Sequence, residues 1–103
     1  MIKLVCLITR PQDVPREVFI EWWLTHHAAV ASRLPELRRY SIGVTHLHSS
    51  DTVPYDGVAE LWFDSVAAME LAFASPLGEA CAREDRELIG SRVAFVVEEY
   101  III

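Results

Sequence analysis

The chain has 103 residues and a mass of 11.7 kDa, which predicts one domain that spans residues 1–103. A formal net charge of −6 argues against nucleic acid as a partner, because an acidic surface repels phosphate groups. No apolar run approaches the ~20 residues that cross a bilayer, and we recognise no targeting segment, so we expect a cytoplasmic protein with no membrane partner.

The first part of the sequence predicts a strand, a helix and a second strand. Residues 2–9 form a short, β-branched apolar run, which is typical of a strand. Pro15 suits the first turn of a helix, and apolar side chains recur with helical period over residues 15–33. Residues 37–48 then alternate in character, so they predict a long second strand.

The second part predicts a strand, two helical pieces and a last strand. Residues 49–55 are rich in Ser, Thr, Asp and Pro and indicate a loop. A third strand is expected at 56–63, helices at 65–74 and 77–89, and a fourth strand at 92–102.

The predicted order βαββαβ is that of the ferredoxin-like α+β fold, a four-stranded antiparallel sheet with its helices on one face. The hydrophobic fraction is 52% and the mean hydropathy is +0.26. A domain of this size has too small a core to bury so many apolar side chains by itself. The uncovered face is expected to carry Tyr40, Ile42, Val44 and Trp62, or else the neighbouring residues of the same strands that point the other way. A second copy packed on that face would form a dimeric α+β barrel, so we predict a homodimer that binds a small molecule inside the barrel.

Three blocks of sequence resemble one known family. Residues 19–28 (FIEWWLTHHA), 34–40 (LPELRRY) and 56–65 (DGVAELWFDS) resemble the EthD family of dimeric α+β barrel proteins. The resemblance implies the barrel fold and the homodimer. Through similarity to methylmuconolactone isomerases and to polyketide cyclases, it also implies a cofactor-free acid–base enzyme of isomerase, cyclase or lyase type. Its substrate would be a small lactone, aromatic or polyketide-like molecule.

His27 is the first candidate catalytic residue, and it matches the helix histidine of that family. It lies at the edge of the apolar helix stripe, one turn after Trp23. A histidine that is half removed from water can act as a general acid or base near neutral pH. The alternative is a structural histidine that bridges the helix and the second strand.

The second strand supplies Tyr40, His46 and His48 as further candidates. Tyr40 can donate a hydrogen bond to a developing enolate, or it can be a core aromatic. His46 and His48 share a strand face, His46 as a catalytic candidate and His48 as a pocket-lining one. With Glu60 they match the ligand types of a two-histidine, one-carboxylate metal site, but the i, i+2 spacing is a weak signal. We therefore predict neither a metal nor a cofactor.

The third strand adds Glu60 as a candidate acid or base, on the face that we assign to the barrel interior with Trp62. A buried carboxylate is costly unless it is paired or protonated, so the alternative is an ion pair with Arg39 or with another basic residue near the interface. Trp23 and Trp62 are candidate walls for a planar substrate, although aromatic residues at such spacings are often plain core.

The predicted catalytic set is thus His27, Tyr40, His46 and Glu60, gathered on one apolar face of the barrel. Two alternatives stay open. One is a cofactor-free monooxygenase that acts on electron-rich aromatics, and the other is a small-molecule binding protein without catalytic activity.

Overall fold

A computed structural model describes residues 1–47 and 53–103 of the chain. The predicted element order is confirmed. In chain order the elements are β1 (Ile2–Thr9), α1 (Arg16–Trp22), the π-helical turn η1 (Trp23–His27), α2 (Ala28–Ala31), β2 (Arg39–Val44), β3 (Gly57–Phe63), α3 (Val66–Ala74), α4 (Pro76–Leu88) and β4 (Ser91–Glu98).

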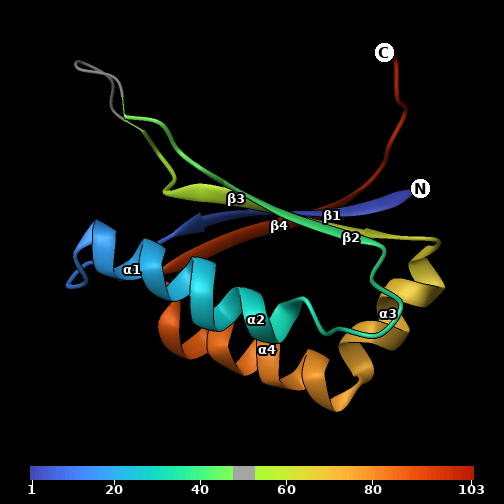
Figure 1. The fold of residues 1–103 in the computed structure, drawn as a ribbon, viewed down its shortest axis with the longest axis horizontal. Coiled ribbons are helices and arrows are strands. Elements are labelled where there is room, and N and C mark those ends of the chain that lie inside the picture. Colours follow the sequence, from blue (N-terminus) through green and yellow to red (C-terminus); the bar gives the residue numbers. More distant parts are fainter. Residues whose placement is uncertain (48–52) are drawn as a thin grey trace.

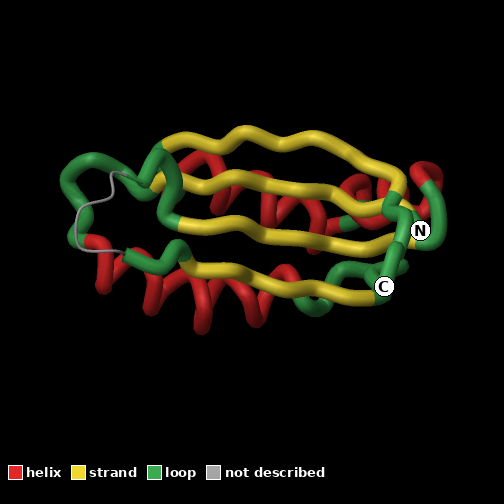
Figure 2. The backbone as a smooth tube through the Cα atoms, turned by 90° about the horizontal axis from the view of Figure 1, so that it is seen from above, coloured by secondary structure: helices red, strands yellow, loops and turns green. Residues whose placement is uncertain are grey.

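The four strands form one antiparallel sheet in the order β2-β3-β1-β4. All the helices lie against one face of this sheet and the other face is uncovered, as Figures 1 and 2 show. This is the ferredoxin-like arrangement that the sequence predicts. None of the helices in the described part of the chain is long and apolar enough to cross a bilayer.

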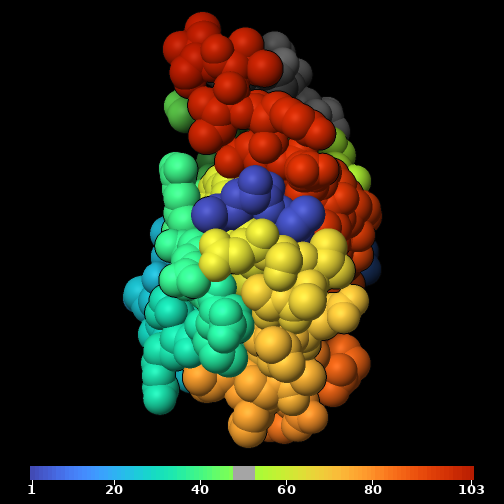
Figure 3. All heavy atoms as spheres, turned by 90° about the vertical axis from the view of Figure 1, so that its right-hand side faces the viewer, coloured from blue at the N-terminus to red at the C-terminus, as the bar shows by residue number. Residues whose placement is uncertain are grey.

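Two strands are shorter than predicted, β2 ending at Val44 and β4 at Glu98. Beyond β4 the chain continues as residues 100–103, with Ile102 88% exposed. These last residues rise from the sheet on its uncovered side and stand above the rest of the molecule (Figures 1 and 3). The apolar residues that predict a strand up to residue 102 are present, but among residues 1–47 and 53–103 no neighbouring strand pairs with them.

The first helical segment runs from Arg16 to Ala31 and contains a π-helical turn at its centre. In this turn hydrogen bonds span five residues instead of four, so the turn accommodates an extra residue. Trp23 and His27, which are four residues apart, both lie on the buried side of the segment, whereas His26 points outward with its side chain 62% exposed.

The core lies between the helices and the sheet, and its largest fully buried side chains are Trp23, Phe19 and Phe63. Trp23 packs so close to β3 that a methyl group on Gly57 would lie 2.7 Å from its ring and 2.4 Å from the carbonyl oxygen of Gly43. Glycine at position 57 therefore allows the tryptophan to reach the sheet.

Asp56 fixes the chain where β3 begins. It is buried, and its carboxylate accepts hydrogen bonds from the Arg10 backbone N–H at 2.8 Å and from Arg10 Nη1 at 2.5 Å. Arg16 lies 3.8 Å from the same carboxylate. These contacts join the ends of β1 and β3 to the start of α1, which holds that helix in place over the sheet.

The register of the strands decides which side chains face the helices. Arg39 lies opposite Trp62, and Tyr40 lies opposite Leu61, a core residue. Because neighbouring side chains on a strand point to opposite faces, Tyr40 faces the helices while Trp62 and Glu60 face away. The expectation that Tyr40, Ile42 and Val44 share the uncovered face with Trp62 is therefore wrong.

The uncovered face has an apolar strip, which consists of Val5, Leu7, Val93 and Phe95 on the neighbouring strands β1 and β4. Phe95 is 46% exposed. A soluble domain rarely leaves such a strip in contact with water.

The same face has a charged corner, which consists of Lys3, Arg39, Glu60, Trp62 and Glu99. Lys3 Nζ lies 2.8 Å from Glu60 Oε2 and 3.2 Å from Glu99 Oε2. Trp62 Nε1 donates a hydrogen bond of 2.9 Å to Glu99 Oε1, and the cationic groups of Lys3 and Arg39 lie over its ring. Glu60 is thus paired with a basic residue, as the ion-pair alternative expects, and that residue is Lys3.

Candidate functional site

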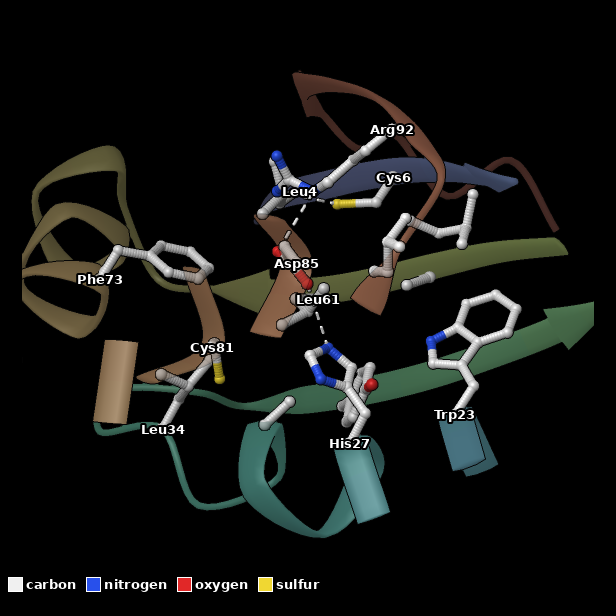
Figure 4. Close-up of a pocket in the computed structure, with 15 residues that line it drawn as sticks. Leu4, Cys6, Trp23, His27, Leu34, Leu61, Phe73, Cys81, Asp85 and Arg92 are labelled. Atoms are coloured by element: carbon white, nitrogen blue, oxygen red, sulfur yellow. Dashed lines mark hydrogen bonds and ion pairs between the residues drawn. The ribbon is translucent and has the colours of Figure 1, made fainter. Parts of the chain in front are cut away.

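A small cavity lies between the sheet and the helices, lined by residues of β1, β2, β3, α4, β4 and the first helical segment (Figure 4). It offers about 40 Å³ to the centres of water molecules, which is room for a few waters. Most of the lining is apolar. Seven of the lining side chains can donate hydrogen bonds or exchange protons, and they are Cys6, Trp23, His27, Tyr40, Cys81, Asp85 and Arg92.

His27 is the most constrained of these residues, with its side chain 9% exposed. Its Nδ1 lies 2.7 Å from Glu84 Oε1, and its Nε2 lies 3.4 Å from Asp85 Oδ1. Its ring also stacks on Trp22, with a centroid distance of 5.1 Å. An ionised carboxylate only accepts hydrogen bonds, so the contact with Glu84 places a proton on Nδ1. In the neutral ring, the lone pair is then on Nε2, which faces Asp85.

Glu84 and Asp85 are consecutive residues of α4 that contact opposite ring nitrogens of His27. Glu84 also lies 3.4 Å from His26 Nε2 through its other oxygen. Burial raises the pKa of Asp85, and the positive charge of Arg92 opposes this effect. Asp85 is therefore a carboxyl group that holds its proton more firmly than an exposed one.

The raised pKa of Asp85 predicts how stability depends on pH. The folded chain keeps this proton at pH values where the unfolded chain, with a pKa near the ordinary value of about 3.9, has lost it. The contribution to the free energy of unfolding is thus fully present below about pH 3.9 and falls as pH rises through the folded-state pKa. Urea unfolding at a series of pH values should show the advantage of the wild type over Asp85→Asn shrinking in this window. Parallel curves for the two proteins would contradict the prediction.

Arg92 is on β4 at the open end of the cavity. Its Nε lies 3.5 Å from Asp85 Oδ2, and its Nη2 lies 3.4 Å from Cys6 Sγ. Burial raises the pKa of the Cys6 thiol, with Arg92 acting in the opposite direction. Figure 4 shows a continuous line of contacts from His27 through Asp85 to Arg92 and Cys6.

Tyr40 and Cys81 complete the polar part of the cavity. Burial raises the pKa of the Tyr40 hydroxyl, and burial raises the pKa of the Cys81 thiol to about 11. Both groups therefore remain protonated near neutral pH, and the Tyr40 hydroxyl is available as a hydrogen-bond donor.

The structure brings together only part of the predicted site. Trp23, His27 and Tyr40 line the same cavity. Glu60 and Trp62 lie on the opposite side of the sheet, in the charged corner.

The second strand ends before its two candidate histidines. His46 lies beyond the end of β2 and is exposed, and His48 is outside the described residues. The prediction of one cluster on one barrel face is therefore wrong, because the sheet separates its members.

Glu84, Asp85 and Arg92 are not among the site residues that the sequence predicts. A signal for Asp85 was present, since Gly78 and Cys81 are the buried residues of α4 and Ile89, which follows it, is also buried. Asp85 continues this helical spacing and belongs on the buried side. No comparable pattern marks Arg92.

The residues of the weakly predicted metal site are not brought together in the described part of the chain. Among residues 1–47 and 53–103, no group of three His, Cys, Asp or Glu side chains is arranged to hold a metal ion. The two carboxylates beside His27 contact its two different nitrogens, which is a hydrogen-bonding arrangement.

Comparison with known proteins gives one family and many similar folds. The model of the EthD domain matches residues 11–89. An EthD family protein of Bacillus halodurans has a TM-score of 0.86 and 21% sequence identity, over 97% of this chain and 99% of the other. A search of curated proteins gives no significant match.

Two further solved structures are relevant. A dimeric ferredoxin-like protein of unknown function from Thermobifida fusca has a TM-score of 0.72 and 20% identity, over 93% of this chain and 88% of the other. SnoaB, a cofactor-independent oxygenase of Streptomyces nogalater, has a TM-score of 0.71 and 19% identity, over 99% of this chain and 95% of the other. At these identities the similarities establish the fold alone.

Proposed function

The chain belongs to the EthD family, and on that basis we propose that it is a cofactor-free acid–base enzyme of isomerase, cyclase or lyase type. Its substrate is a small lactone, aromatic or polyketide-like molecule. One observation carries the proposal: His27 is held between Glu84 and Asp85 at the wall of a mainly apolar cavity.

His27 is arranged to move a proton. Glu84 orients the imidazole through Nδ1, so that Nε2 accepts a proton from a carbon atom next to a substrate carbonyl group. The imidazolium that forms then donates hydrogen bonds to both carboxylates. Asp85 faces the same nitrogen and, because burial raises its pKa, is able to hold or return a proton.

Tyr40 supports the same reaction from the sheet side of the cavity. Proton removal next to a carbonyl group places negative charge on the carbonyl oxygen, and a fixed hydroxyl donor stabilises that charge. The raised pKa of Tyr40 keeps its hydroxyl protonated for this role. Return of the proton to another carbon completes an isomerisation, and loss of a leaving group completes an elimination.

A substrate enters from the side of α4 and β4. A surface depression of about 280 Å³ is lined by Phe73, Ala82, Asp85, Arg86 and Arg92, and three of these residues also line the cavity. The cavity itself is smaller than the ~300 Å³ or more of typical ligand pockets, so the ring of a substrate requires side chains at the entrance to move. Phe73, which Figure 4 shows among the residues of the cavity, also lines the depression.

Deuterium exchange tests the proposal even when the product of the reaction is unidentified. The protein is incubated in D2O with a panel of butenolides, methyl-substituted muconolactones and polyketide-like diketo acids. Proton NMR then follows the C–H signals next to each carbonyl group. We expect catalysed exchange in at least one compound, because proton removal is the first step of every reaction in this class. Binding without exchange across the panel would favour a small-molecule binding protein.

The oxygenase alternative has support from the fold shared with SnoaB. The same base can remove the proton from an electron-rich phenol, and the resulting anion reacts with oxygen. Oxygen consumption that accompanies product formation would support this alternative, whereas turnover under anaerobic conditions would exclude it.

The proposed enzyme works as a homodimer through the uncovered sheet face. The apolar strip of Val5, Leu7, Val93 and Phe95 needs a cover, and sheet-on-sheet packing of a second copy supplies a surface of the same kind. The Thermobifida fusca protein, which shares the fold, is described as dimeric.

A charge placed in the apolar strip should separate the two copies. Phe95→Glu puts an unpaired carboxylate between the two sheets, so we expect a monomer by light scattering after size-exclusion chromatography. Val96→Glu is the matched control, because Val96 is the next residue and is 43% exposed, but it points to the opposite face. The control should remain dimeric. A monomeric wild type, or a control that dissociates as readily, would contradict the prediction.

A further inference from the structure

The depression at the cavity entrance is positively charged in an acidic protein. Its charged lining residues are Arg86, Arg92 and Asp85, two cations and one carboxyl group, whereas the whole chain has a formal net charge of −6. Such a local excess attracts anions and repels cations. The charge therefore selects among the molecules that reach His27.

Arg92 has more hydrogen-bond donors than partners. A guanidinium group has five N–H donors in a planar fork. In the described part of the chain, its contacts are one long hydrogen bond to Cys6 Sγ, at 3.4 Å, and the carboxylate of Asp85 at 3.5 Å. Its side chain is 35% exposed, so it is accessible from the depression.

Arg92 is also placed beside the proposed proton-transfer group. One oxygen of Asp85 lies 3.5 Å from Arg92 Nε, and the other lies 3.4 Å from His27 Nε2. The guanidinium of Arg92 is thus separated from the imidazole by about the width of one carboxyl group. That separation suits a molecule whose anionic end is a few bonds from its reactive carbon.

We infer that the substrate carries a carboxylate, and that Arg92 binds this carboxylate at the entrance while the rest of the molecule extends toward His27. The inference rests on the proposed function, since it takes the cavity as the substrate site. It narrows the substrate class to lactone acids and aromatic or polyketide-like carboxylic acids. Neutral lactones and simple phenols lack the group that Arg92 recognises.

The alternative role for Arg92 is structural, because its charge compensates that of Asp85. A structural arginine affects folding and the titration of Asp85, but it does not distinguish an anionic ligand from a neutral ligand of the same shape. Discrimination between two such ligands therefore separates the two roles.

Benzoate and benzamide are a suitable pair, because they have nearly the same shape and differ in charge. Binding of each is measured by titration of the ¹⁵N-labelled protein, using the amide signals of Ala82, Asp85 and Arg92. We expect benzoate to bind the wild type at least about tenfold more tightly than benzamide, as charge-assisted, two-point recognition implies. Arg92→Gln should abolish this preference.

Two further variants make the result specific. Arg83→Gln removes the same charge from an exposed position on α4 outside the depression, and it should retain the preference. Arg92→Lys keeps the charge but lacks the fork, so it should retain only part of the preference. If thermal unfolding shows that Arg92→Gln does not fold, the test compares the benzoate-to-benzamide affinity ratio of Arg92→Lys with that of the wild type.

The outcomes distinguish this inference from the proposed function. Equal binding of benzoate and benzamide, or a preference that persists in Arg92→Gln, would overturn the role of Arg92 whatever the protein catalyses. An Arg92-dependent preference without any deuterium exchange would instead support an anion-binding pocket and count against the proposed enzyme.

Discussion

Replacement of His27 by Gln is expected to lower the rate of substrate deuterium exchange by about 10²- to 10⁴-fold, the usual contribution of a positioned general base. Glutamine is close to histidine in size and still hydrogen-bonds, so it can retain a contact with Glu84. Glutamine has no basic nitrogen, so the side chain at position 27 can no longer accept the proton that leaves the substrate. The measurement is the exchange rate by proton NMR at saturating substrate.

His26→Gln is the matched control for this variant. His26 is the neighbouring residue and also contacts Glu84, but its ring is outside the cavity and its side chain is mostly exposed. We expect its exchange rate to remain within a factor of a few of the wild type. Equal rates for His27→Gln and the wild type would exclude His27 as the base, and an equal loss in both variants would point to Glu84 or to folding.

Replacement of Trp23 by Ala should produce the largest loss of stability of any single change proposed for this chain. The side chain is 1% exposed, packs against Phe19 with a centroid distance of 5.9 Å, and fills the space above Gly57. Truncation of a buried tryptophan costs about 3–5 kcal/mol, which is a large part of the total stability of a small domain. Urea unfolding followed by circular dichroism measures the difference.

Leu24→Ala, at the next position, separates packing from helix propensity. Leu24 is 47% exposed, so its replacement should cost less than about 1 kcal/mol. The prediction for Trp23 would not survive if both variants lost the same free energy. It would also fail if the urea concentration at the midpoint of unfolding were the same for Trp23→Ala and the wild type.

The order of helices and strands could be predicted because each element follows a simple periodicity. The β-branched run at residues 2–9 and the Ser-Pro pair at the start of α4 are local signals, and local backbone preferences decide such elements. The length of β4 could not be predicted in this way. The residues that follow β4 in the chain are as apolar as the strand itself. Only the position of the neighbouring strands determines where pairing ends.

The face on which each strand residue lies was harder to predict, because both faces of this sheet are apolar. In β3, Ala59 and Leu61 face the helices while Val58 and Trp62 face away. Alternation correctly groups such residues within one strand. It does not determine the register between strands, and that register places Tyr40 on the side of Leu61 rather than on the side of Trp62.

The candidate site could be predicted only where its residues belong to the first helical segment or to β2. His27, Trp23 and Tyr40 lie in the cavity, whereas the acidic partners of His27 come from α4, 57 residues further along the chain for Glu84. Long-range pairs of this kind depend on how two helices pack side by side. The spacing of Asp85 from Cys81 indicates burial, but it does not indicate which residue of another helix it meets.

The π-helical turn from Trp23 to His27 implies that chain length matters at this point more than residue type. Deletion of one residue within the turn would allow an uninterrupted α-helix, which is the more favourable backbone. If the deleted residue lay between them, Trp23 and His27 would be three residues apart instead of four, which would move the His27 ring relative to the carboxylates of α4. A shortened protein of this kind would have a more regular helix but would lose the present contacts of His27 with Glu84 and Asp85, on which the proposed activity depends.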